Sequence, residues 1–477
     1  MLFNSWTFIG LVLCTLCIYY LPFLKKKQIY ILLIASAFFY AYNSLALMLL
    51  LILSAFLNSL ASYLAIYSKK PRVYASIGVV INLLVLAFFK YGKLFASSFI
   101  NDSTSPIEAF MINLPLPLGI SFFTFSGISL VVDSFKGRYD QSKEVVQPSF
   151  LAHLKNTFFY ITFFPKLLAG PIAKSRNFYP QIGSKSWKDV DFILIFKALV
   201  TGFFLKLVIA DNLKDFTFWM AYPYFEQRGT GSLLLMLFGY TIQIFSDFAG
   251  YSLIAIGIAA LFGYKLPTNF NYPYISASFR EFWKRWHITL SNFLMEYLYI
   301  SLGGNRKGKI RTYLNLLLTM MLGGLWHGAA WSFLTWGTYH GLCLVAERAL
   351  CGKRENCISL GSSKYAVNIS KIISIIFVFV MVSFGWLFFV LQDFSQAMLY
   401  LHCICSNFGK FSFVDPKLMP ICIYVIPVVL YHLIYLFREK TVIKRYVLQL
   451  SYVFYGCMLF LILTNSGSAE SFVYFQF

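Results

Sequence analysis

Apolar segments long enough to cross a lipid bilayer follow one another along almost the whole chain. A transmembrane helix needs about 20 consecutive apolar residues. Candidate spans lie near residues 5–23, 29–67, 72–89, 116–134, 153–172, 190–210, 231–263, 311–346, 369–392, 418–437 and 443–464. Several runs are too long for one span or contain Gly and Pro, which predicts kinked or re-entrant segments lined by protein or water. We therefore expect an all-α, polytopic integral membrane protein with about 10–13 membrane-inserted helices.

The chain has too few charges to build a water-facing surface. Only 12% of its 477 residues are charged and 59% are hydrophobic, whereas a soluble domain has roughly 25% charged residues. The net charge of +21 comes from 40 basic and 19 acidic residues, and the basic ones form short clusters between apolar runs. Such clusters lie at 25–27, 69–72, 306–307 and 438–440. This is the positive-inside pattern of cytoplasmic loops, which also meet membrane lipid, and it argues against nucleic acid as a partner.

The basic clusters also predict the orientation of the chain. If 25–27 is cytoplasmic the N-terminus lies outside, and if 438–445 is cytoplasmic the C-terminus lies outside as well. No basic leader precedes the first apolar stretch, so we interpret that stretch as a retained helix and not as a signal peptide. Short linkers predict one membrane domain over residues 1–464, followed by an extracytoplasmic tail over 465–477.

The segment 279–297 differs from the spans because its apolar residues recur at helical spacing. Arg280, Lys284 and Arg285 lie off this apolar stripe. A basic amphipathic helix with Trp on its apolar face is typical of the membrane interface. The alternative is a helix that packs wholly inside the protein. The stripe consists of Phe279, Phe282, Trp283, Trp286, Leu290, Phe293, Leu294 and Tyr297.

Among six histidines, His327 is the strongest candidate for chemistry. It lies in residues 322–331 (LGGLWHGAAW), within a run from 312 to 346 that has no Asp, Glu, Lys or Arg. An ionisable group deep in a membrane segment is costly, so a function is the default hypothesis. Imidazole is also the side chain best suited to move a proton near neutral pH. The alternative is a neutral histidine that is hydrogen-bonded between helices.

The remaining histidines and the cysteines carry weaker signals. His287 follows Trp286 at the border of the stripe and could face a cytosolic entrance or serve only as an interfacial anchor. His340 is a weaker candidate, and we expect structural roles for the others, which are His153, His402 and His432. The nine cysteines are scattered and predict no metal site. The chain has no Walker-type, Rossmann, HExxH or GxSxG motif, which disfavours phosphate-driven transport and a self-contained serine hydrolase.

Four sequence blocks occur in a specific order over residues 110–345. They are 117–125 (PLGISFFTF), 163–171 (FFPKLLAGP), 282–291 (FWKRWHITLS) with 302–306 (LGGNR), and 324–328 (GLWHG). Together they resemble the membrane-bound O-acyltransferase superfamily, and within it the bacterial branch that acetylates alginate and peptidoglycan. A fifth block, 247–252 (DFAGYS), matches partly, because Ala249 and Leu253 replace a serine and a later acid of the family pattern, and Ser301 stands where the family often has Pro.

The resemblance implies a helical fold around an intramembrane funnel, with His327 as the catalytic histidine and His287 as a second functional one. It implies cytosolic acetyl-CoA as the donor substrate, with no permanently bound cofactor or metal. It also implies a periplasmic SGNH-type serine esterase as partner and a bacterial inner-membrane location. The anionic phosphates of acetyl-CoA favour a basic mouth, which Lys284, Arg285, Arg306 and Lys307 could supply.

The C-terminal tail ends in four aromatic residues within 472–477 (FVYFQF). Exposed aromatic residues at a free end are unfavourable unless they dock. The ending resembles the Phe-x-Tyr-x-x-Phe termini of some envelope acylation proteins, which implies that Tyr474 carries the acyl group. The alternative is a tail that only anchors in the membrane interface.

We therefore expect a transmembrane O-acetyltransferase that passes acetyl groups outward to a cell-envelope polysaccharide. Abundant Phe, Ile, Tyr and Lys indicate AT-rich codons and slightly favour peptidoglycan over alginate. Two other classes stay open: a transporter or flippase of an envelope precursor built from broken helices, and an acyltransferase that acts on lipid or protein.

Overall fold

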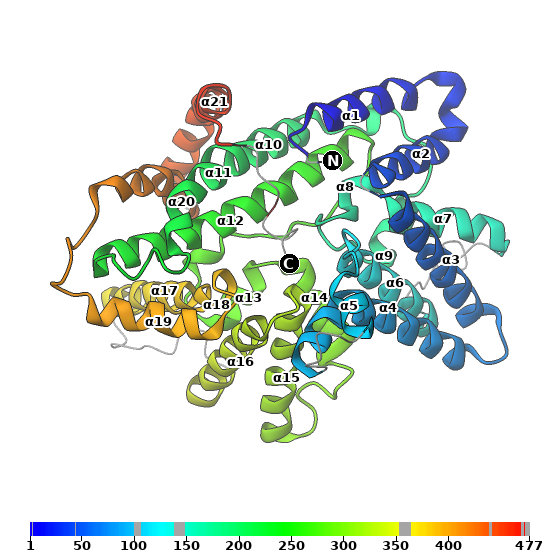
Figure 1. The fold of residues 1–477 in the computed structure, drawn as a ribbon. Helices are drawn as coiled ribbons and strands as arrows, with labels where there is room; N and C mark the ends of the chain where they lie inside the picture. The colour runs from blue at the N-terminus through cyan, green and yellow to red at the C-terminus, as the bar shows by residue number, and fades with distance from the viewer. Residues whose placement is uncertain are drawn as a thin grey trace. The chain divides into compact units, whose positions relative to one another are not determined.

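A computed structural model describes residues 1, 3–42, 44–99, 106–137, 148–352, 364–437, 441–468 and 472. These residues are helical with connecting loops and include no strand (Figure 1). The predicted all-α class is therefore confirmed. Tyr474, predicted to carry the acyl group, and Phe477 lie outside the described residues.

The chain divides into two compact units, each described here by itself. The first contains Met1–Leu199 and Tyr251–Pro267, and the second contains Val200–Gly250 and Thr268–Phe477. Helices α10 (Phe192–Phe203) and α12 (Thr230–Leu261) contribute residues to both. A single membrane domain over 1–464 stays a prediction.

In the first unit, α3 packs closely against α4, α6 and α7. Small residues allow this approach, since a Cβ added to Gly78 of α4 would lie 2.7 Å from the Cβ of Ala61 on α3. The buried amides of Asn58 and Asn82 hydrogen-bond to each other between the same two helices, at 2.7 and 3.2 Å. The helices lying wholly in this unit are α1 (Trp6–Tyr19), α2 (Gln28–Ala41), α3 (Leu45–Tyr67), α4 (Pro71–Phe99), α5 (Pro106–Ile112), α6 (Ile120–Lys136), α7 (Phe150–Thr162), α8 (Phe164–Leu167) and α9 (Ser175–Phe178).

The second unit is organised around the hairpin of α15 and α16, which lie side by side (Figure 1). A Cβ on Gly324 would lie 2.9 Å from the Cα of Gly337 and closer still to the carbonyl oxygen of Phe333. Only glycines allow the two backbones to cross this tightly. The helices wholly in this unit are α11 (Asp211–Thr217), α13 (Phe279–Arg285), α14 (Ile288–Phe293), α15 (Gly308–His327), α16 (Trp331–Cys351), α17 (Lys364–Gly385), α18 (Leu387–Val390), α19 (Phe394–Ser406), α20 (Pro420–Phe437) and α21 (Thr441–Thr464).

The predicted continuous helix over 279–297 is wrong in one respect. The segment breaks into α13 and α14 at Trp286 and His287, and His287 has a left-handed backbone with φ of 41°. A π-helix, Leu294–Tyr299, then follows α14. Five of the eight stripe residues are buried inside the unit and the other three are half-buried. The Trp286 ring lies 4.9 Å from the ring of Trp386. Periodicity alone could not predict the break, because apolar spacing continues through it.

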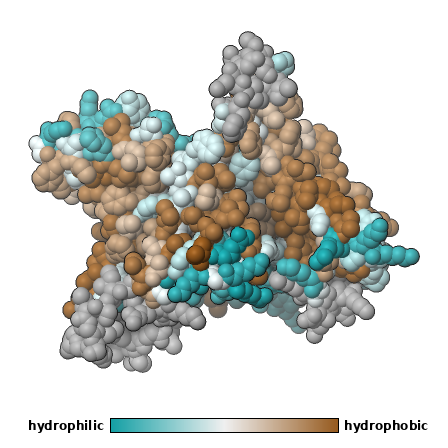
Figure 2. Space-filling model, turned by 90° about the horizontal axis from the view of Figure 1, so that it is seen from below, coloured by the Kyte–Doolittle hydropathy of each residue, from teal (hydrophilic) through white to brown (hydrophobic). Residues whose placement is uncertain are grey.

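The apolar surface is that of a membrane protein. Six described helical segments are long and apolar enough to cross a bilayer, and the bent pair Trp6–Tyr19 and Pro22–Ala41 gives a seventh if it is counted as one span. The six segments are Leu45–Tyr67, Pro71–Ala96, Phe192–Met220, Thr230–Leu261, Asn368–Val390 and Pro416–Leu436. Figure 2 shows apolar side chains over wide areas of the surface, with polar side chains confined to patches. Exposing apolar patches of this extent to water is unfavourable, so lipid must cover them. The chain is therefore a multi-pass membrane protein.

Candidate active site

His327 is the last residue of α15, where the tight crossing with α16 places it inside the second unit. Its side chain is buried, and aromatic rings surround it. The ring centroids of Trp326, Trp336 and Phe389 lie 5.1, 5.0 and 5.6 Å from that of the imidazole. Gly328 ends the helix in an extended conformation directly after the histidine. The imidazole therefore lies at a helix end in surroundings that exclude bulk water.

His287 lies beside His327, with 6.3 Å between the ring centroids. The side-chain carbonyl of Asn269 lies 3.3 Å from His287 Nδ1, which we assign as the protonated nitrogen because the amide oxygen can only accept. The Thr289 hydroxyl donates to the same oxygen. His287 Nε2 has no hydrogen-bond partner among the described residues. Complete burial lowers the pKa of His287 well below its usual range, so the ring is neutral and Nε2 offers a lone pair.

A third imidazole lies behind Trp336. The rings of His327 and His340 are each 5.0 Å from the Trp336 ring. His340 is fully buried, and neither of its ring nitrogens has a hydrogen-bond partner in the described part of the chain. The Trp283 ring lies 5.2 Å from it. His340 is thus enclosed by indoles and is separated from His327 by one of them.

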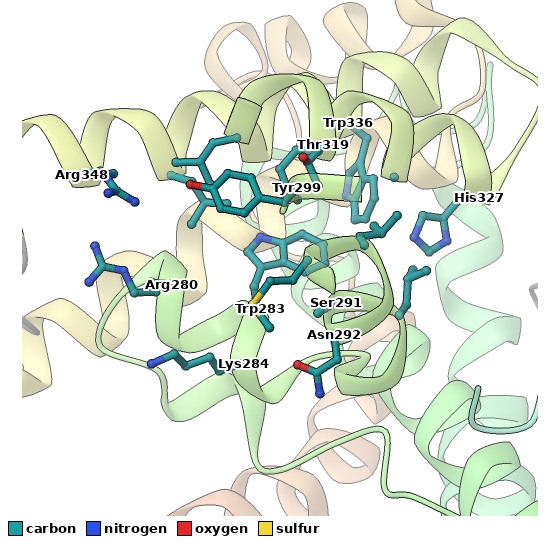
Figure 3. Close-up of a pocket in the computed structure, with 17 residues that line it drawn as sticks. Arg280, Trp283, Lys284, Ser291, Asn292, Tyr299, Thr319, His327, Trp336 and Arg348 are labelled. Carbon is teal, nitrogen blue, oxygen red and sulfur yellow. The ribbon is translucent and has the colours of Figure 1, made fainter. Parts of the chain in front are cut away.

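A pocket of about 320 Å³ connects His327 with a group of basic residues. Figure 3 shows His327 at one end, Trp283 in the middle and Arg280, Lys284 and Arg348 at the opposite end. The walls between them are mainly apolar, with a few polar groups. Besides aromatic side chains, the apolar lining includes Leu290, Leu294, Met295, Leu316, Met320 and Leu344. An elongated ligand with an anionic head and a small reactive end fits this distribution of charge.

Of the four residues predicted to bind acetyl-CoA, one lines the pocket and three do not. Lys284 lines the pocket. Arg285 does not, because its guanidinium pairs with Glu281 at 2.8 Å and donates to the carbonyl of Asn271 at 3.0 Å. Arg306 and Lys307 are also absent from the lining, so their role stays a prediction.

Sequence reasoning missed two basic residues of the pocket. Arg280 was recognised only as a charge off the apolar stripe, and Arg348 carried no signal at all. Arg348 joins the pocket because α16 runs back along α15. Glu347, its neighbour, accepts hydrogen bonds from the backbone N–H groups of Phe279 and Arg280 and so ties α16 to the start of α13.

The tail returns to the histidines through Phe472, which is described although Tyr474 is not. Only 1% of the Phe472 surface is exposed, and its ring lies 5.5 Å from that of Phe248. The Phe248 ring in turn meets His287 edge-on at 4.6 Å. The ring of Phe248 therefore lies in contact with both Phe472 and His287.

Buried imidazoles therefore lie beside an apolar pocket with a basic end, in a multi-pass membrane protein. The model of the MBOAT, membrane-bound O-acyltransferase family, matches residues 73–391. The chain belongs to this family and is an acyltransferase.

Two bacterial relatives are similar over most of their length. A probable alginate O-acetylase of Azotobacter vinelandii is 34% identical over 87% of this chain and 80% of its own. A peptidoglycan O-acetyltransferase of Helicobacter pylori is 35% identical over 78% of this chain and 72% of its own. A teichoic acid D-alanyltransferase of Bacillus subtilis is 29% identical over 58% of this chain and 69% of its own. The resemblance drawn from the sequence blocks is thereby confirmed.

Proposed function

We propose that this acyltransferase passes acetyl groups from cytosolic acetyl-CoA to the outer side of the bacterial inner membrane, for O-acetylation of a cell-envelope polysaccharide. One observation carries the proposal: a single pocket has His327 at one end and Arg280, Lys284 and Arg348 at the other. The donor phosphates pair with the cations, while the apolar walls take the pantetheine arm. The acetyl thioester then lies next to His327.

The proposed chemistry needs a base in a dry site. His327 takes the proton of an acceptor hydroxyl as its oxygen attacks the thioester carbonyl carbon. The new C–O bond forms, the C–S bond breaks, and the imidazolium returns the proton to the leaving thiolate, which gives free CoA thiol. Before the transfer, neutral His287 accepts the hydrogen bond of this single proton at Nε2 and holds the hydroxyl near His327, until the hydroxyl turns its proton toward His327.

The first acceptor in this proposal is the Tyr474 hydroxyl. Tyr474 follows the buried Phe472 by two residues, which span at most about 7 Å of extended chain. The Phe472 ring is linked to His287 through Phe248, and this contact supports the proposal that the tail brings its tyrosine to the imidazole pair. Acetyl-tyrosine then offers the acetyl group outside, although acetyl-CoA never crosses the membrane. If the tail is only an anchor, a serine hydroxyl of a partner protein enters instead.

Transfer onward to sugar requires a partner, and we propose an SGNH-type serine esterase outside the membrane. Relatives named for alginate and for peptidoglycan support a polysaccharide acceptor. The residue composition slightly favours peptidoglycan. Both termini lie outside in this proposal, because the basic clusters then face the cytoplasm.

Radiolabelled acetyl-CoA supplied to the purified protein in proteoliposomes tests the function. We expect label on Tyr474, and we expect it to disappear in His327→Ala. His402→Ala, at an exposed position on α19, is the matched control and should keep the label. Label on lipid supports an acyltransferase of lipid, and an active preparation without any label supports a transporter; both results contradict the proposal.

A further inference from the structure

The beginning of the tail is bound to the second unit by two hydrogen bonds. The Gly467 N–H donates to the carbonyl of Leu207 at 2.9 Å, and the Asn212 side chain donates to the carbonyl of Asn465 at 2.9 Å. Both bonds join residues more than two hundred positions apart in the chain. The tail thus leaves α21 along a defined path.

The surface that receives the tail is a π-helix, Phe204–Ala210, together with the start of α11. Such segments are rare and often mark functional sites. Lys206 within it is buried, and its ammonium lies 2.7 Å from carboxylates of both Asp211 and Asp247. Breaking a buried ion pair leaves an uncompensated buried charge, so the cluster holds this backbone firmly. Leu207 and Asn212 therefore present their hydrogen-bonding groups from a rigid platform.

Gly467 fits against this platform because it has no side chain. A Cβ at position 467 would lie 2.8 Å from the carbonyl carbon of Asp211 and 2.9 Å from the nitrogen of Asn212. Both are backbone atoms, which cannot turn away as a flexible side chain could. Gly456, eleven residues earlier in α21, offers a contrast, since a Cβ there would meet nothing within 4 Å.

The tail meets the second unit again at Phe472, next to Phe248. Asp247, the neighbour of Phe248, belongs to the ion cluster that holds the π-helix. One stretch of α12 therefore serves both attachment points. Four residues separate Gly467 from Phe472, so fixing Gly467 limits where Phe472 can lie.

We infer that residues 465–467, the π-helix and the start of α11 form a latch that positions Phe472 beside Phe248 and so near His287, with Gly467 and Asn212 as positioning residues. The effect of the latch on turnover rests on the proposed function. Whether the latch holds this segment in place can be tested independently of acetyl transfer.

Hydrogen exchange of the full-length protein in nanodiscs, followed by mass spectrometry, tests the position of the tail. We expect slow exchange at Gly467 in the unaltered protein, and exchange at least tenfold faster in Gly467→Val, while peptides from α15 and α16 stay unchanged. Gly456→Val is the matched control and should leave the tail protected. Asn212→Asp keeps the size of the side chain but removes the donor, so it should speed exchange to a smaller extent. Fast exchange in the unaltered protein, or a protected tail in Gly467→Val, overturns the latch.

Acetyl-transfer kinetics on the same variants test its consequence. We expect kcat to fall about tenfold or more in Gly467→Val, because misplacing a reacting group by about 1 Å can cost up to 100-fold, while KM for acetyl-CoA stays within twofold. Gly467→Val with released tail and unchanged kcat overturns the positioning role. Full activity in His327→Ala contradicts the proposed function instead, and the exchange result then still decides the latch.

Discussion

The imidazoles of His287 and His327 lie with their ring centroids 6.3 Å apart, although one follows α13 and the other ends α15. Asn269 fixes the ring of His287, and the helix end together with Trp336 confines His327. The pair thus combines a base with an acceptor that orients the nucleophile.

The tail tyrosine gives the most direct prediction. Tyr474→Phe removes the hydroxyl that would carry the acetyl group, so acetylation should fall to background while membrane insertion is intact. The measurement is label transfer to the outer acceptor, with insertion followed by membrane fractionation. Full transfer in this variant rejects the tyrosine relay and leaves an acyltransferase that uses a partner's hydroxyl.

The pH dependence of activity should respond to Asn269. In Asn269→Asp a carboxylate replaces the amide beside His287 Nδ1 and favours the protonated ring, which raises the pKa of His287 from its depressed value. The neutral form is the active one in our proposal, and it is lost as the pH falls through that pKa. The acid limb of the kcat/KM profile should therefore move to higher pH. An unchanged limb would show that the protonation of His287 does not matter.

The basic end of the pocket should control donor affinity. Arg348→Gln removes a charge that faces the donor phosphates, so KM for acetyl-CoA should rise about fivefold to 20-fold, with little change in kcat. The rise should shrink at high salt, because ions screen the attraction. Lys417→Gln, at an exposed position far along the chain, is the charge-matched control. If Arg306→Gln raises KM and Arg348→Gln does not, the donor enters elsewhere.

Trp336 should restrict the length of the acyl group. It lines the pocket and meets His327 edge-on, so a smaller ring there leaves space next to the thioester. Trp336→Phe should raise the rate with propionyl-CoA relative to acetyl-CoA by about tenfold, as expected for a pocket enlarged by the size of a methylene or two. Competition between the two donors measures the ratio. An unaltered ratio in a folded variant would place the acyl group away from this indole.

The crossing of α15 and α16 should not tolerate a side chain. Gly324→Ala forces a Cβ against the backbone of Gly337 and Phe333, and such overpacking costs about 1–3 kcal/mol or more. We expect a clearly lower midpoint of thermal unfolding in detergent, together with lost activity. Gly10→Ala, inside α1 where a Cβ would meet nothing within 4 Å, should not lower the midpoint. A stable Gly324→Ala protein would mean that the two helices are farther apart.

Much of this protein can be read from its residues because the signals are local. Long apolar runs predict helices in a bilayer wherever they occur, and a histidine within such a run stands out without knowledge of its neighbours. His327 is therefore visible in the sequence, as is the aromatic ending of the tail. The basic residues of the pocket were only partly predictable, because the charges along a segment do not show which way each side chain points. Arg285 turns to Glu281, while Lys284 lines the pocket.

The sequence by itself determined that this protein lies in a membrane, that it is helical, and that His327 is the strongest candidate for chemistry. Each of these depends only on the type of a residue and on its near neighbours in the chain. Tertiary structure decided which distant groups meet. The left-handed break at His287, the arrival of Arg348 through the α15–α16 hairpin, and the contact of Gly467 with the π-helix all depend on packing between segments far apart in sequence. Hydropathy and periodicity do not predict contacts between distant segments, because two backbones become complementary in shape only once both are folded.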